Sequence, residues 1–206
     1  MADGRRQRGA ATRERLIAAA RELFGQRGYE NTPIEAVLEA SGVARGALYH
    51  HFASKAALFD AVAEEVFVEI AERTDQAAKG HSDPLERIRA GSREWLQMSL
   101  DPAVQRLALL DPQTVLGWAR WRALDERHSL GGLRAGFERL ERHGRIPAGQ
   151  GELMANLLLA ALNEAALFIA YAPDEQAALA TSLAAIDTLL DRLAPLEGAA
   201  PGAHAG

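Results

Sequence analysis

The sequence predicts an all-α protein of about nine to ten helices, and three observations favour this fold class. Ala and Leu are abundant, whereas aromatic residues make up only 6% of the chain, a balance typical of helices rather than of an all-β sandwich. Apolar residues recur at helical spacing in most segments, and no alternating strand pattern is found. The 206 residues are 48% apolar, so the helices can bury a core.

The chain opens with a basic segment that leads into a first amphipathic helix. Residues 1–11 are rich in Gly and Arg, and we expect them to form a flexible basic arm. Thr12 is a candidate helix cap, and Gly28 is a residue type that ends helices. Between them, one stripe of apolar residues has helical spacing: Leu16, Ile17, Ala20, Leu23 and Phe24.

Two short helices joined by a tight turn follow. Thr32-Pro33 combines a cap with a proline at the first helical position, and Gly42 allows the left-handed turn that ends this helix. A third helix is predicted from about residue 44 to residue 52. This pattern predicts a helix-turn-helix domain over residues 12–58.

Residues 59–194 are predicted to form a second helical domain. A long helix starts near Ser54, carries apolar residues at helical spacing and ends by Gly80. Three Asp-Pro pairs (83–84, 101–102 and 111–112) each offer a capping carboxylate and a helix-starting proline. The remaining helices are placed at about 84–100, 102–109, 113–143 with a break near Ser129, 149–172 and 174–194. Residues 195–206 are expected to be disordered.

Charge is distributed unevenly along the chain. The net charge of the chain is −5. Residues 1–60 hold nine Lys/Arg and seven Asp/Glu, whereas the remainder holds 14 Lys/Arg and 21 Asp/Glu. A basic front on an acidic body indicates that only the front meets an anionic partner.

The third predicted helix divides into two faces. At 100° per residue, Arg45, Gly46, Tyr49 and His50 fall within an arc of about 140°. The opposite face is expected to pack inward: Ala44, Ala47, Leu48, His51 and Phe52. A helix of this width fits the DNA major groove, where Arg45 can reach a guanine edge or a phosphate. Taken singly, His50 or Lys55 is more often an ordinary solvated residue, but the whole set at this spacing after a helix-turn-helix pattern favours contact with DNA.

Residues 12 to about 62 resemble the DNA-binding domain of the tetracycline-repressor (TetR) family of bacterial transcriptional regulators. The stretches that carry the resemblance are TRERLIAAARELF (12–24), GY (28–29), SGVARGALYHHF (41–52) and SK (54–55). The resemblance implies that residues 44–52 are a recognition helix and that Tyr49 and Lys55 bind phosphates. Two residues depart from the pattern: Ala44 replaces a capping Ser or Thr, and Glu35 stands where a basic or neutral residue is common. The candidate DNA-binding residues are Thr32, Ala44, Arg45, Gly46, Tyr49, His50 and Lys55.

A homodimer is expected, because one recognition helix reads too few base pairs for a specific operator. In the last helix, leucines and an isoleucine form a heptad seam, and the preceding helix is apolar nearly all round. The candidate interface residues are Leu157, Ala161, Leu179, Leu183, Ile186 and Leu190. Alternatively, both helices merely close the core of one chain.

The resemblance also implies a cavity for a small-molecule effector among the C-terminal helices. The candidates are Trp95, Met98, Leu109, Trp118, Trp121, Phe137, Asn163 and Phe168, which suit an apolar or aromatic molecule. The aromatic residues can equally be core. Asn163 and Glu164 interrupt the most apolar run, where they either pair within the subunit or address a ligand.

Other classes of protein are disfavoured. There is no cysteine, no metal-ligand spacing and no nucleophile or phosphate-loop motif, so we expect no enzyme, cofactor or metal site. The apolar run from Leu153 to Ala172 is interrupted by polar residues, and a cytoplasmic protein without a membrane span is expected. The prediction is a ligand-responsive repressor with a double-stranded DNA operator. The alternatives are a helical binding protein or enzyme with a vestigial helix-turn-helix, and a dimeric interaction module without an effector.

Overall fold

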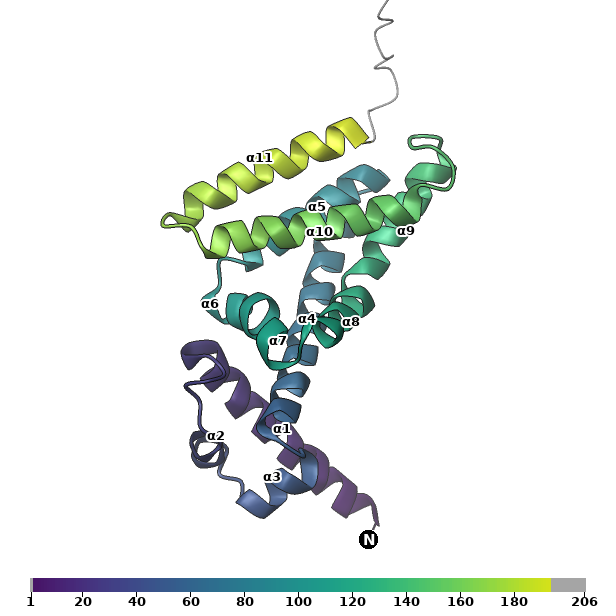
Figure 1. Ribbon diagram of the computed structural model, residues 1–206. Helices are drawn as coiled ribbons and strands as arrows, with labels where there is room; N and C mark the ends of the chain where they lie inside the picture. The colour runs from purple at the N-terminus through teal and green to yellow at the C-terminus, as the bar shows by residue number, and fades with distance from the viewer. Residues whose placement is uncertain (1, 194–206) are drawn as a thin grey trace, which may run out of the picture. The chain divides into compact units, whose positions relative to one another are not determined.

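The computed structural model describes residues 2–193, and every regular element in that range is a helix (Figure 1). The all-α prediction is therefore confirmed. The helices are α1 (Ala2–Arg27), α2 (Ile34–Ser41), α3 (Arg45–His51), α4 (Lys55–Ala78), α5 (Pro84–Met98), α6 (Pro102–Val104), the π-helix η1 (Gln105–Leu110), α7 (Asp111–Val115), α8 (Trp118–His128), α9 (Leu130–Arg142), α10 (Gly151–Ala170) and α11 (Glu175–Leu193).

The chain divides into two compact units, and each contains segments that are distant in the sequence. One unit consists of residues up to Ile70 together with Met98–His128. The other consists of Ala71–Gln97 together with the residues from Ser129 onward. The boundary predicted between residues 58 and 59 therefore differs from the division by packing, which falls inside α4.

The first unit is built around the apolar stripe of α1. The predicted inward residues Leu16, Ile17, Ala20, Leu23 and Phe24 are all buried, and so are Leu58, Val62, Val66 and Ile70 of α4. Phe24, Tyr29 and Phe59 form a three-ring cluster with centroids 5.3–5.6 Å apart. This cluster packs the end of α1 against the start of α4. Helix α3 directly precedes α4 in the chain.

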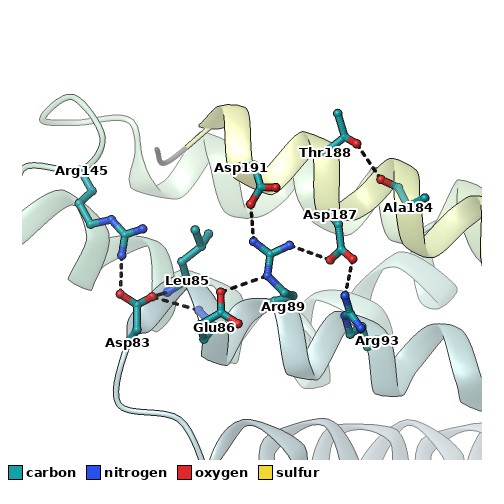
Figure 2. A network of polar contacts seen from close by, with 10 residues as sticks. All are labelled: Asp83, Leu85, Glu86, Arg89, Arg93, Arg145, Ala184, Asp187, Thr188 and Asp191. Atoms are coloured by element: carbon teal, nitrogen blue, oxygen red, sulfur yellow. Dashed lines mark hydrogen bonds and ion pairs between the residues drawn. The ribbon is translucent and has the colours of Figure 1, made fainter. Parts of the chain in front are cut away.

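The second unit packs α10 between α9 and α11, which lie on either side of it (Figure 1). An ion-pair network joins α5 to α11: Arg89 donates to Asp187 at 2.7 Å and to Asp191 at 2.6 Å, and Arg93 pairs with Asp187 (Figure 2). By length and composition α10 could cross a membrane. Its residues Leu158, Leu162 and Ile169 are buried within this unit.

Several helix ends are where the sequence places them, because they depend on neighbouring residues. Gly28, Gly42 and Gly144 have φ of 78°, 63° and 70°, the left-handed region that glycine tolerates. Asp83 accepts hydrogen bonds from the Leu85 and Glu86 amides at 2.7 and 3.1 Å, as predicted for a cap. The break near Ser129 is also present, between α8 and α9.

Two expectations for the elements are wrong. Helix α1 begins at Ala2 rather than at Thr12, so the backbone of residues 2–11, which were predicted to be flexible, is helical. Asp111 was expected to cap a helix, but its carboxylate instead accepts from the Tyr29 amide at 2.8 Å. That bond joins residues 82 positions apart, and no local pattern predicts it. The predicted tail, 195–206, lies outside the described residues.

Candidate nucleic-acid interface

The turn between α2 and α3 sets the direction of the third helix. Gly42 ends α2 in the left-handed conformation, and its amide donates to the Glu39 carbonyl. Val43, Leu48 and Phe52 are then buried, at 7%, 0% and 5% exposure. These three side chains fasten α3 to the domain by one face, as its apolar spacing predicts.

The opposite face of α3 is exposed. Arg45, Gly46, Tyr49 and His50 all lie at the surface, and a side-chain carbon placed on Gly46 would meet no atom within 4 Å. The surface position of these four residues agrees with the helical wheel. Ala44 differs from the wheel: it is exposed rather than inward, because it precedes the helix in extended conformation (φ −66°, ψ 143°) and forms no side-chain cap.

Arg45 is not a free cation in this surface. Its guanidinium forms an ion pair with the Glu35 carboxylate of α2, and both side chains remain more than half exposed. The pKa of Glu35 lies below its usual range, because its own backbone amide and then Arg45 stabilise the charged form. Glu35 was predicted as a departure from the family pattern, but its contact with Arg45 was not predicted.

Lys55 lies at the start of α4, beside this face. The Ser54 hydroxyl accepts from the Ala57 amide at 3.1 Å, so Ser54 caps α4 as predicted. The Lys55 ammonium lies 4.1 Å from the centroid of the Tyr29 ring, a cation–π contact that holds a long side chain in place.

Thr32 does not face outward, contrary to the expectation that it contacts phosphate. It is 0% exposed, and its hydroxyl donates to the Gly28 carbonyl at 2.8 Å and lies 3.2 Å from the Leu23 carbonyl. Pro33 rather than Thr32 occupies the cap position of α2. Thr32 therefore closes the turn after α1, and its side chain is removed from the candidate interface.

The candidate effector residues are divided between the two units. In the first unit Met98, Leu109 and Trp121 are buried, and the Trp121 indole donates to the Ala108 carbonyl at 2.9 Å. Trp118 is 63% exposed and stacks on Trp121. In the second unit Trp95, Phe137 and Asn163 are buried, whereas Phe168 is 56% exposed. Glu164, expected inside the apolar run, is also exposed.

The predicted dimer seam of α11 is partly core. Leu179, Ile186 and Leu190 are buried within their own chain, so the heptad spacing reflects packing inside the second unit. Leu183 and Ala161 are half-buried. On α10, however, Leu157 is 55% exposed. It shares one helical face with Leu153, Phe168 and Tyr171, which are exposed as well.

Comparison with known proteins gives consistent matches. Residues 16–62 match the family model described as bacterial regulatory proteins, tetR family, and residues 85–193 match the tetracyclin repressor-like C-terminal domain. A crystal structure of a TetR-family transcriptional regulator from Pectobacterium atrosepticum is 34% identical, with a TM-score of 0.82 over 93% of this chain and 98% of that one.

Two curated relatives match part of the chain. The transcriptional repressor AcnR of Corynebacterium efficiens is 30% identical over 52% of this chain and 56% of its own. The regulator UidR of Escherichia coli K12 is 32% identical over 43% of this chain and 41% of its own. The matched segment thus spans about half the length of these relatives.

The fold and the exposed α3 define a helix-turn-helix protein. The two family models together cover both parts of the chain, and the C-terminal model alone covers more than half of it. The chain belongs to the TetR family of bacterial transcriptional regulators.

Proposed function

We propose that this protein is a cytoplasmic, homodimeric repressor that binds a palindromic DNA operator and is released by a small apolar or aromatic molecule. The single observation that carries the proposal is the outer face of α3. Arg45, Gly46, Tyr49 and His50 are presented to solvent by a helix whose other face is buried. Such a helix can enter the major groove and place Arg45 at base edges.

A second subunit would use the exposed face of α10. Leu153, Leu157, Phe168 and Tyr171 are each more than half exposed, and the exposed Glu164 lies among them on the same face. Apolar side chains gathered in this way often mark an interface between proteins. A homodimer supplies the two recognition helices that an operator with half-sites about 34–36 Å apart requires.

The effector is assigned by chemistry alone. Within the second unit, Trp95 and Phe137 are buried apolar side chains, and Asn163 adds a buried amide. Such side chains favour an apolar or aromatic ligand with few polar groups.

Operator selection tests the proposal. The purified protein is incubated with a random duplex library, bound DNA is amplified over several rounds, and the selected duplex is titrated by fluorescence anisotropy. We expect an inverted repeat with half-sites about one helical turn apart. Arg45→Ala should reduce discrimination against a shuffled duplex by roughly fivefold to a hundredfold.

Arg192→Ala is the control, since Arg192 is an exposed arginine at the end of α11. It should bind the selected duplex like the wild type. If selection enriches no sequence, the proposed function is wrong; if Arg45→Ala discriminates like the wild type, Arg45 is not the reading residue.

A further inference from the structure

We propose that Glu35 is a specificity-determining residue that positions the Arg45 guanidinium for base readout and disfavours its binding to phosphate. This inference rests on the proposed function and extends it to a residue of α2. It starts from the ion pair between Glu35 in the first turn of α2 and Arg45 in the first turn of α3.

A carboxylate on a DNA-binding face is costly, because it repels phosphates. Glu35 is exposed and paired with Arg45 of α3, and a glutamate side chain is a carboxylate at neutral pH. For affinity alone, a neutral residue would be better here. Total affinity for DNA therefore does not account for this carboxylate. Its contact with Arg45 indicates that it acts on the Arg45 side chain instead.

The ion pair restricts the orientation of Arg45. Arg45 is the first residue of its helix, and its long side chain has many rotamers in water. Glu35 is held at the start of α2, where its own amide contributes to the low pKa of its carboxyl group. One terminal nitrogen of the guanidinium donates to the Glu35 carboxylate. Arg45 also interacts with the Tyr49 side chain on the same face of α3, and the planar fork has further donors that can face a guanine edge.

The ion pair also changes which DNA groups Arg45 prefers. A free guanidinium binds any phosphate, and that contact carries no sequence information. A guanidinium already paired with a carboxylate has less net charge to offer a phosphate but keeps its directional donors. Glu35 thus weakens non-specific binding and preserves the base contact. The quantity that it controls is the ratio of operator affinity to non-specific affinity.

An exposed ion pair contributes little to stability, so its role is tested in DNA binding rather than in folding. The variants are Glu35→Gln and, as the matched control, Glu39→Gln. Glu39 is an exposed carboxylate one turn further along α2, so its substitution removes the same charge from the same helix. Each protein is titrated with the selected operator and with a shuffled duplex at several salt concentrations.

We expect Glu35→Gln to bind the shuffled duplex a few-fold more tightly and to lose about tenfold in the affinity ratio. Glu39→Gln should strengthen both affinities alike and leave the ratio unchanged. In an Arg45→Ala background, Glu35→Gln should have no further effect on the ratio, because Glu35 acts through Arg45.

Three outcomes would overturn the inference. An unchanged ratio in Glu35→Gln means that the carboxylate only repels phosphate. Tighter operator binding with a higher ratio means that Glu35 competes with DNA for Arg45. A loss that persists in the Arg45→Ala background means that Glu35 reads a base itself. All three presuppose that the wild type selects an operator, so they are distinct from failure of the proposed function.

Discussion

At the scale of single residues, the contacts with DNA divide into those that read bases and those that only bind the backbone. Arg45 has the fork of donors needed for a base edge, whereas Tyr49 offers one hydroxyl and Lys55 one ammonium. The Lys55 ammonium lies against the Tyr29 ring at the start of α4, and Lys55 is not part of α3. We therefore expect Tyr49 and Lys55 to contribute affinity without sequence preference.

This division gives a prediction for Lys55→Ala and Tyr49→Phe. Each variant should bind the operator and the shuffled duplex more weakly, and within one variant the two affinities should fall by the same factor. For Lys55→Ala, which loses a charge, that factor is roughly fivefold. Lys55→Ala should also lower the slope of log affinity against log salt by about 1, whereas Tyr49→Phe, which removes a neutral hydroxyl, should not. Anisotropy titrations between low and moderate salt measure both quantities. A selective loss of operator binding in Lys55→Ala would show that Lys55 reads sequence.

At the scale of elements, α5 is held by charges at its start and along its length. Asp83 caps its first amides and pairs through its other oxygen with Arg145 at 2.6 Å, while Arg89 joins it to α11 (Figure 2). Burial opposes ionisation of Asp83, but the Glu86 and Leu85 amides and Arg145 outweigh it, and the pKa of Asp83 is lowered. The Arg145 side chain is 7% exposed and that of Asp83 is 38% exposed, so water screens this pair from the Asp83 side.

We predict that Asp83→Asn destabilises the fold by about 1–2 kcal/mol at neutral pH, because Asn keeps the cap and loses the charge that faces Arg145. The folded-state pKa of Asp83 is lowered, so its contribution is complete above the ordinary value of 3.8. The contribution is lost as pH falls through the lower folded value. The difference between wild type and variant in urea unfolding should therefore shrink in acid.

Asp174→Asn is the control for this prediction. Asp174 also caps a helix, through the Ala177 amide at 3.0 Å, and Asn is an equally good cap. Asp174→Asn should lower the free energy of unfolding by only a few tenths of a kcal/mol. A loss in Asp83→Asn that is no larger than this, or one that persists unchanged in acid, would contradict the role given to the Asp83 charge.

At the scale of the whole molecule, the decisive feature is the exposed apolar face of α10. A specific operator needs two recognition helices, and Leu179, Ile186 and Leu190 of α11 are buried within their own chain. The outer face of α10 can supply the contact between subunits, because Leu153, Leu157, Phe168 and Tyr171 stand on one side of the helix.

We expect Leu157→Glu to convert a dimer into a monomer at micromolar concentration, because it places a charge in an apolar interface. Operator affinity should fall by a hundredfold or more, roughly the contribution of a second half-site. Val68→Glu is the control, since Val68 is an exposed apolar residue on α4 in the other unit. Sedimentation velocity and anisotropy give both readouts. A dimeric Leu157→Glu protein would exclude α10 as the interface.

Much of the fold could be predicted from the sequence because its signals are local. Glycines in left-handed turns, the caps Ser54 and Asp83 and the apolar stripe of α1 all act within a few residues. The same holds for the outer face of α3, since helical periodicity fixes which side chains share a side. The chain alone thus determined the helices, the recognition helix and the resemblance that led to the family.

Only the tertiary structure decided which partner each side chain has. It turned Thr32 inward, joined Asp111 to Tyr29 and Glu35 to Arg45, and assigned Leu190 to the core instead of a seam between subunits. The physical reason is that spacing determines the face of a helix but not what covers that face. Leucines at heptad spacing can pack against their own chain or against a second subunit, and the spacing is the same in both cases. A carboxylate and a cation on different helices form an ion pair only when the turns between those helices bring them into contact.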